Sequence, residues 1–245
     1  MSNRNKPPSI LNEIIRKGIR YVFASSVYYS EKPISFQIYS AYRRSLEIID
    51  RNGNSHVDHK RKIIFIHNPK VAGTTLRKVL KLPKNGFTSH FTPTFLVSPK
   101  IWKEYFSIVA VRHPIERLIS SYYEETRKDH LGFYHRIYPN IHDLNLREYF
   151  ELFKKEPFIT TPQHRYTRHQ LSVKPVDFVI RFENLKEDLK LLSKKVNFKI
   201  NHKSIPHLNK RAYYKNKLLR DKKLIKEIQE YYRHDYAIFG YKYKY

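Results

Sequence analysis

Three short apolar runs lie in the middle of the chain, at residues 63–66, 106–111 and 176–180. None of them alternates between apolar and polar positions, as a strand with one solvated face would. Unbroken apolar runs of this length are typical of parallel strands that are buried on both faces. The pattern therefore predicts strands of a mainly parallel central sheet.

Helical patterns separate these runs. Pro114, after the second run, suits the first position of a helix. The apolar side chains that follow fall on one side of that helix: Ile115, Leu118, Ile119, Tyr122 and Tyr123. After the third run, Asn184 is the predicted N-cap of another helix, with Glu187 completing a capping box. Strands that alternate with helices predict an α/β domain, with ligands bound beyond the carboxyl ends of its strands.

The first sixty residues follow a different pattern. Ile10 and Ile14 are four residues apart, and so are Ile38 and Tyr42, which predicts two amphipathic helices. A polar stretch at residues 50–62 is typical of a loop. We expect a helical extension at residues 1–60 and the main domain at residues 61–245.

The composition fits a globular protein with a substantial core, because 40% of the 245 residues are apolar and 15% are aromatic. The absence of cysteine excludes disulfides, thiolate metal sites and cysteine nucleophiles. No apolar run approaches the roughly 20 residues that a membrane-spanning helix needs. The N-terminus also lacks the apolar core of a secretory signal, so we expect a cytoplasmic protein.

The net charge is +26, from 48 Lys and Arg against 22 Asp and Glu. A field of this sign attracts polyanions, which include nucleic acids, anionic lipid surfaces and acidic polysaccharides. The sign does not choose among them, and a biased genome composition would explain much of the charge equally well.

A candidate phosphate site follows the first apolar run, in the stretch KIIFIHNPKVAGTTLRKVL at residues 62–80. It is not the usual nucleotide loop, because Lys70 precedes Gly73 and no glycine occupies the earlier position. A turn with exposed N–H groups before a helix nevertheless suits a terminal phosphate, with Gly73 permitting close approach. Thr74 and Thr75 add hydroxyl donors.

Two motifs in this order resemble a known family: PKVAGTT after the first predicted strand and VRHPIERLISSYY after the second. They are similar to the carbohydrate sulfotransferases that use 3′-phosphoadenosine 5′-phosphosulfate (PAPS), in the branch that includes the heparan sulfate 2-O-sulfotransferases. Four further segments occur in the same order in that branch: SHFTPTFL, DFVIRFENLKEDL, IPHLNKRAYY and YYRHDYAIFGY. The resemblance therefore covers residues 62–241.

The resemblance implies a P-loop-like sulfotransferase fold, with a mainly parallel sheet flanked by helices. It implies transfer of a sulfuryl group from PAPS to a hydroxyl of a polysaccharide, glycolipid or surface glycan, with adenosine 3′,5′-bisphosphate as the other product. The resemblance implies that no catalytic metal is required, and we expect no specific nucleic-acid partner. The N-terminal helices are compatible with dimerisation, with shaping of the acceptor groove or with contact with a membrane surface.

By the same resemblance, the first turn holds the 5′-phosphosulfate group of the cofactor. This role falls on a run of consecutive residues: Lys70, Val71, Ala72, Gly73, Thr74, Thr75 and Leu76. The ammonium group of Lys70 is implied beside the bridging oxygen, where it stabilises the charge of the leaving group more in the transition state than in the ground state.

The second motif is implied to grip the 3′-phosphate that distinguishes PAPS from ATP. Arg112 and Ser120 match the residues of the family that do so, and a planar guanidinium can meet phosphate oxygens in pairs. A late segment, HLNKR, is implied to close over the cofactor, or else forms a solvated basic face. Its candidate contacts are Asn209, Lys210 and Arg211.

His90 is the candidate general base, because the family branch carries a histidine between the two cofactor motifs and imidazole accepts protons near neutral pH. The alternative is a histidine that caps a loop or packs under an aromatic ring. Glutamate serves as the base in some relatives, so Glu124 or Glu125 is the fallback.

The acceptor is expected at the segment TPQHRYTRHQL, residues 161–171. His164, Arg165 and Arg168 suit the carboxylates or sulfates of an acidic sugar, and Tyr166 suits stacking on a sugar ring. A basic loop on a basic protein is the plainer alternative.

Two other classes of protein stay open at this point. One is a basic protein that binds nucleic acid or a membrane surface and whose phosphate loop is only structural. The other is a P-loop kinase that requires magnesium and ATP.

Overall fold

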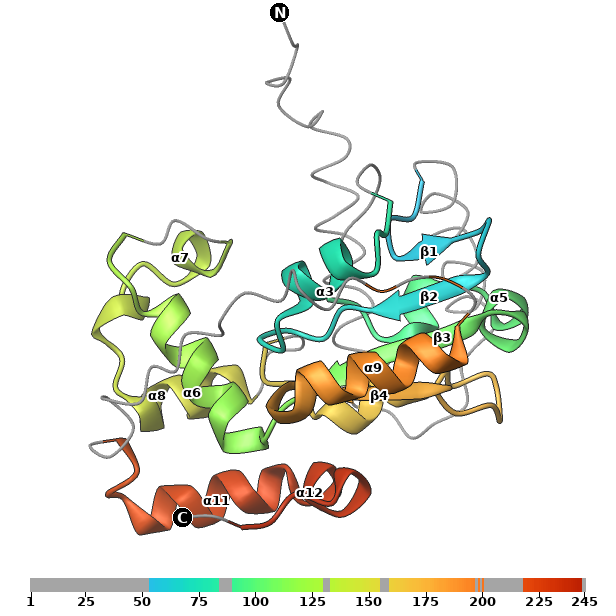
Figure 1. Cartoon of the computed structure of the whole chain (residues 1–245). Coiled ribbons are helices and arrows are strands. Elements are labelled where there is room, and N and C mark those ends of the chain that lie inside the picture. The colour runs from blue at the N-terminus through green and yellow to red at the C-terminus, as the bar shows by residue number, and fades with distance from the viewer. Residues whose placement is uncertain are drawn as a thin grey trace, which may run out of the picture. The chain divides into compact units, whose positions relative to one another are not determined.

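A computed structural model describes residues 53–83, 90–129, 133–154, 159–196, 198, 200 and 218–243 (Figure 1). The chain divides into two units, residues 1–48 and 49–245, and every described residue belongs to the second. The predicted N-terminal helices lie outside the described residues. The domain boundary at residue 60 therefore stays a prediction.

Four strands form one sheet in the order β1-β2-β3-β4. β2 (Ile63–Ile66) pairs in parallel with β3 (Phe106–Val111), and β3 pairs in parallel with β4 (Phe178–Arg181). β1 (Val57–Asp58) adds an antiparallel edge beside β2. The predicted α/β class with a mainly parallel sheet is confirmed.

Two details of the predicted strands are wrong. The expected loop at residues 50–62 contains β1, a strand too short to show any periodicity. The third strand was expected at residues 176–180, but β4 begins at Phe178. The side chain of Asp177 instead accepts hydrogen bonds from the N–H and the hydroxyl of Ser107, and thereby fixes the start of β4 against β3.

Both faces of the sheet are buried, which explains the unbroken apolar runs. One face packs against the helices α3 (Gly73–Val79) and α9 (Leu185–Lys195), and α9 runs along β4 (Figure 1). The strand residues on that face are Ile63, Phe65, Ile108, Ala110 and Ile180. Residues of the opposite face are also fully buried, namely Ile64, Ile66, Val109 and Val111.

A second core lies among helices, where α6 (Pro114–Glu125), α8 (Leu146–Phe153), α11 (Lys222–Tyr231) and α12 (Arg233–Phe239) pack together (Figure 1). Other described elements are short: α4 (Pro93–Leu96), α5 (Pro99–Glu104), α7 (Phe133–Ile137), η1 (Ile141–Asp143), η2 (Gln163–Thr167) and η3 (Phe182–Asn184). Pro114 does begin α6, as predicted, and the buried face of α6 includes the predicted Ile115, Leu118 and Ile119.

The predicted capping box of α9 is wrong, although the helix itself is confirmed. Asn184 ends the η3 turn with φ −117° and ψ 25°, and its side chain caps no N–H among the described residues. An N-cap side chain needs an extended backbone to reach the first helical turn. Asp188 fills a related role by accepting a 2.6 Å hydrogen bond from the N–H of Arg181.

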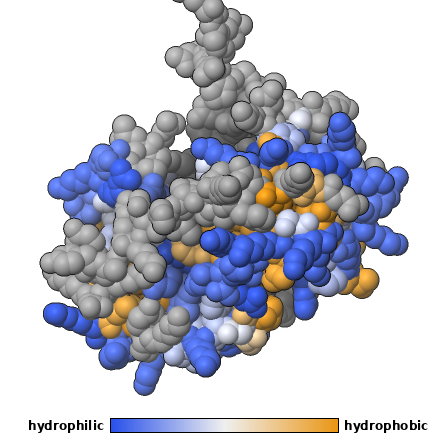
Figure 2. All heavy atoms as spheres, viewed as in Figure 1, coloured by the Kyte–Doolittle hydropathy of each residue, from blue (hydrophilic) through white to orange (hydrophobic). Residues whose placement is uncertain are grey.

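In the face shown in Figure 2, hydrophilic side chains cover much of the described surface and apolar side chains gather in separate areas. The longest helix in the described part of the chain has 12 residues, and none of the described helices combines the length and apolarity needed to cross a bilayer.

Candidate active site

The turn between β2 and α3 has the backbone of an anion-binding loop. Lys70 and Ala72 adopt positive φ angles of 63° and 62°, which is uncommon for residues other than glycine. Left-handed residues that alternate with ordinary ones turn neighbouring N–H groups toward one side and form a concave nest for an anion. The turn ends at Gly73, the first residue of α3.

Gly73 is required in this turn because of a neighbouring side chain. A Cβ atom on Gly73 would lie 1.9 Å from Cδ2 of His67, which is closer than any real contact. The sequence suggested that glycine admits a phosphate, whereas the structure shows the imidazole of His67 in that space. The backbone N–H groups of the turn remain the candidate phosphate ligands.

The two predicted cofactor cations, Lys70 and Arg112, come from residues that contact each other. Arg112 follows β3 directly, and its Nη1 donates to the carbonyl of Lys70 at 3.4 Å. Nζ of Lys70 lies 3.7 Å from Oε2 of Glu124, so the fallback base forms an ion pair with the catalytic candidate. The carboxyl ends of β2 and β3 thus bring both residues to the same edge of the sheet, as the parallel sheet predicts.

Arg112 carries a donor that a bound anion would satisfy. Its guanidinium lies 4.2 Å from the ring centroid of Phe182 and 3.8 Å from a carboxylate oxygen of Glu116. Its Nε is buried and has no hydrogen-bond partner among the described residues. Burial lowers the pKa of this guanidinium below its usual value, because the charged form loses its hydration. A buried N–H without a partner destabilises the fold further.

Ser120 lies on the face of α6 that meets these cations. Glu116, Ser120 and Glu124 are spaced four residues apart and share one stripe of the helix. The first and last members of the stripe approach Arg112 and Lys70. The half-buried Ser120 between them is therefore well placed to add a hydroxyl to the same site.

The other predicted cofactor residues differ in what they can contribute. Val71 and Leu76 are fully buried in the sheet core, so only their backbone can reach a ligand. Thr74 is exposed and Thr75 is half-buried on the first turn of α3, which leaves their hydroxyls accessible. Asn209, Lys210 and Arg211 lie outside the described residues, and their role stays a prediction.

His90 lies beside the turn in a defined orientation. Its Nδ1 is 2.8 Å from the carbonyl oxygen of His67, and because a carbonyl only accepts, the neutral ring carries its proton on Nδ1. Nε2 is then the atom that can take up a proton. The rings of His67 and His90 meet edge to face with centroids 4.5 Å apart.

His56, His67 and His90 form a cluster in which desolvation keeps the first two neutral. Desolvation lowers the pKa of His67 to about 2 and the pKa of His56 to about 3, and the nearby His90 acts in the same direction on both. His90 is the exposed member, so it is the one that an acceptor can reach.

The predicted acceptor segment contains an imidazole–carboxylate pair. Nδ1 of His164 lies 2.8 Å from Oδ1 of Asp235, and that fully buried carboxylate also accepts the N–H groups of Gln163 and His164. Such a pair fixes the ring and its tautomer, as in catalytic dyads. Arg165 and Arg168 are exposed beside it.

Tyr166 does not fit the role that the sequence suggested. Its side chain is completely buried, so it cannot stack on a sugar. Its hydroxyl instead donates to the carbonyl of His90 at 3.1 Å. The structure therefore gives Tyr166 the task of holding the candidate base.

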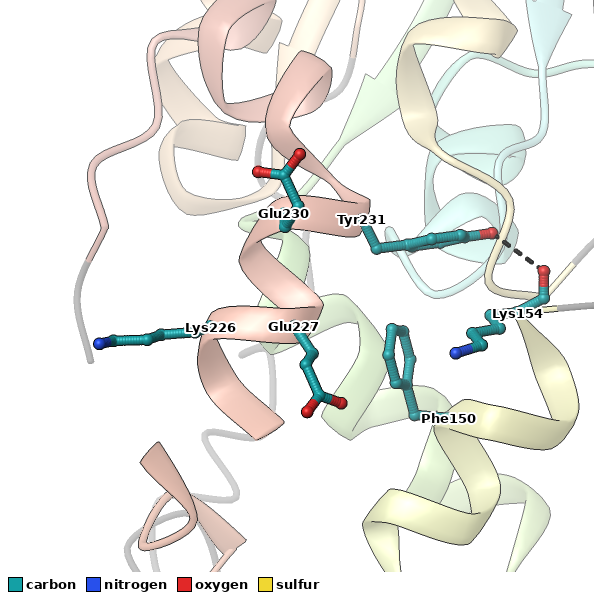
Figure 3. A pocket seen from close by; sticks show the side chains of 6 residues that line it. All are labelled: Phe150, Lys154, Lys226, Glu227, Glu230 and Tyr231. Atoms are coloured by element: carbon teal, nitrogen blue, oxygen red, sulfur yellow. Dashed lines mark hydrogen bonds between the residues drawn. The ribbon is translucent and has the colours of Figure 1, made fainter. Parts of the chain in front are cut away.

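A separate groove lies between α8 and α11, with a cavity volume of about 540 Å³ (Figure 3). Its lining consists of Phe150, Lys154, Lys226, Glu227, Glu230 and Tyr231, and none of these is a predicted site residue. In Figure 3 the hydroxyl of Tyr231 points to the carbonyl of Lys154, at 3.4 Å. Within the described ranges, no cluster of three residues could hold a metal ion.

The arrangement fits a nucleotide with two separate phosphate groups, because two cations, hydroxyl donors and a backbone nest converge at the ends of β2 and β3. In comparison with known families, residues 54–242 match the Sulfotransferase family. No curated protein and no solved structure matches the chain.

The family match spans all described helices and strands. It decides among the three classes that the sequence left open, because it points to sulfuryl transfer rather than to phosphoryl transfer or to simple polyanion binding. The chain belongs to the sulfotransferase family, and by that membership it is an enzyme that takes its sulfuryl group from PAPS.

Proposed function

We propose that this sulfotransferase acts on a hydroxyl of a carbohydrate, in a polysaccharide, a glycolipid or a surface glycan. The transfer chemistry is supported by Lys70 and Arg112 at the carboxyl ends of the parallel strands, with His90 held beside the same turn by His67. The order of motifs over residues 62–241 supports a carbohydrate acceptor.

The cofactor residues divide between two ends of the nucleotide. The turn of Lys70 to Gly73, with Thr74 and Thr75, would hold the 5′ end through N–H groups, hydroxyls and one ammonium. Arg112 and Ser120 would hold the 3′-phosphate. When bound, PAPS supplies the activated sulfuryl group.

Lys70 would stabilise the charge that develops on the leaving oxygen. Its ammonium is held near Glu124, 3.7 Å from Oε2. A cation that is fixed before the reaction stabilises the transition state at little reorganisation cost.

His90 would take the proton of the acceptor hydroxyl on Nε2. Its Nδ1–H is held by the carbonyl of His67, and its own carbonyl is held by Tyr166. A base with fixed tautomer and fixed backbone meets the geometric requirement for general base catalysis.

The acceptor would bind along the segment of η2. Arg165 and Arg168 are exposed cations there, and His164 is oriented by Asp235. Carboxylates or sulfates of an acidic sugar would pair with these groups, and the net charge of +26 would raise the local concentration of such an acceptor.

A screen of glycans with radiolabelled PAPS tests this proposal. With an accepted glycan in hand, Lys70→Ala and His90→Ala should each lower turnover by about 10²-fold or more, the range for a lost electrostatic or acid–base group. Lys78→Ala and His59→Ala, which change exposed side chains, are the matched controls. Label transfer to none of the glycans, or undiminished turnover in both site variants, would contradict the proposal.

A further inference from the structure

The side chain of Gln163 is paired with the backbone of Arg112. Gln163 is completely buried. Its Nε2 donates to the carbonyl of Arg112 at 2.7 Å, and its Oε1 accepts the N–H of Arg112 at 2.9 Å. The pairing of β3 with β4 ends at Val111. For Arg112, the next residue, the side-chain amide of Gln163 makes the two backbone hydrogen bonds that a neighbouring strand would otherwise make.

The same amide also reaches the turn of the 5′ site. Nδ2 of Asn68 donates to Oε1 of Gln163 at 3.2 Å, and Asn68 stands two residues before Lys70. Asn68 donates in addition to the carbonyl of Ala110 in β3, at 3.2 Å. Gln163 therefore joins the ends of the two strands that deliver the site cations.

The position of Gln163 is itself fixed from two sides. Its N–H donates to the buried Asp235 at 2.7 Å. The buried Arg117 of α6 holds the preceding residues, because its guanidinium donates to the carbonyls of Ile159 at 3.0 Å and Thr161 at 2.6 Å. A rigid support of this kind can hold a second group to within the tolerance that ligand binding demands.

We propose that Gln163 is a positioning residue that sets the peptide of Arg112 and so aligns its guanidinium with the 3′-phosphate of the cofactor. This inference rests on the proposed role of Arg112. Because the guanidinium stands at the end of a long side chain, a small rotation of the Arg112 peptide displaces it markedly. Gln163 would thus support the selection of nucleotides that carry a 3′-phosphate.

The test compares two nucleotides by isothermal titration calorimetry. Adenosine 3′,5′-bisphosphate carries the 3′-phosphate, and adenosine 5′-monophosphate lacks it. The quantity of interest is the ratio of their dissociation constants, because a general loss of fold affects both nucleotides alike. Gln163→Met keeps the length of the side chain without the amide, and Gln163→Glu keeps acceptor oxygens without the donor. Gln170→Met makes the same change at an exposed position of the same segment.

Gln163→Met should lower the preference for the bisphosphate on the order of tenfold, as expected when a charge-assisted contact is misaligned. Gln163→Glu, which removes the donor to the Arg112 carbonyl and places a carboxylate there, should lower it at least as much, and Gln170→Met should leave it unchanged. An unchanged preference in both Gln163 variants, or an equal weakening of both nucleotides, would overturn the inference. If neither variant folds, Gln163 is needed for the fold itself rather than for aligning Arg112, and the inference is overturned.

Arg112→Ala separates this inference from the proposed function. If that variant loses the preference and the Gln163 variants keep it, the positioning role fails while the site assignment stands. If Arg112→Ala keeps the preference, the assignment of Arg112 itself is wrong, and the role of Gln163 falls with it.

Discussion

At the scale of single residues, each cation of the site is paired with a carboxylate at a distance longer than a hydrogen bond. The Lys70–Glu124 and Arg112–Glu116 contacts are 3.7 and 3.8 Å, which exceeds the usual length of a charge-assisted hydrogen bond. Partly exposed pairs of this kind contribute little to stability. They hold the cations in place, and a phosphate with shorter contacts can displace them.

Glu116→Gln should therefore tighten the binding of adenosine 3′,5′-bisphosphate. The change removes a carboxylate that competes with the 3′-phosphate for Arg112, and a coupling of about 0.2–1 kcal/mol corresponds to a gain of up to about fivefold. Titration calorimetry measures it, with Glu187→Gln on the exposed face of α9 as the control. Weaker binding in Glu116→Gln would mean that Glu116 orients Arg112 instead of competing for it.

His56, which is buried, and His67, which is half-buried, predict a pH dependence of stability. Desolvation lowers the pKa of His56 to about 3 and that of His67 to about 2. Below about pH 6.5 these histidines are therefore protonated in the unfolded chain but stay neutral in the folded chain. The free energy of unfolding should fall as pH drops from about 6.5 toward 3, by up to about 1.4 kcal/mol per pH unit for each histidine.

Chemical denaturation at pH 7 and pH 5 measures this slope. His56→Gln keeps a side-chain donor for the carbonyl of Phe65, which His56 Nδ1 contacts at 3.0 Å, and removes one titrating group. Its slope should be shallower than that of the wild-type protein. Equal slopes in the two proteins would show that His56 does not contribute to the acid sensitivity.

At the scale of elements, one buried side chain ties α6 to the acceptor segment. Arg117 is 1% exposed, and in the described part of the chain it meets carbonyl groups and the ring of Tyr232 rather than a carboxylate. Three of its hydrogen bonds go to consecutive carbonyls at residues 159–161, and a further, longer one goes to Oδ1 of Asn68 at 3.5 Å. A buried guanidinium bound in this way fixes the segment strongly, since each buried carbonyl left without a donor destabilises the fold.

Arg117→Met should lower the free energy of unfolding by about 2–5 kcal/mol, because it leaves buried carbonyls unpaired. It should also raise hydrogen exchange in η2, which follows the contacted residues. Arg127→Met, just beyond the C-terminal end of α6, is the matched control and should leave stability nearly unchanged. Similar losses in the two variants would contradict a special role for Arg117.

At the scale of the whole molecule, the sequence predicts the parts whose signal is local. Buried strands appear as apolar runs, and α6 appears as a proline followed by an amphipathic stripe. The turn between β2 and α3 appears as a glycine motif. Hence the class of fold, the placement of Lys70 and the placement of Arg112 were all accessible from the sequence.

Contacts between distant residues were not accessible in this way. Gln163 and Asp235 are 72 residues apart, and so are Thr160 and Tyr232, so no periodicity or spacing connects them. Tyr166 shows the same limit, because an aromatic residue in a basic loop suggests a surface, while the fold places it under His90. Supporting residues of the site therefore became visible only in three dimensions.

A crystal structure with adenosine 3′,5′-bisphosphate tests the central claim most directly. The 5′-phosphate should lie on the turn from Lys70 to Thr75, and the 3′-phosphate should contact Arg112 and Ser120. Nucleotide density away from the ends of β2 and β3, or a reversed placement of the two phosphates, would contradict it.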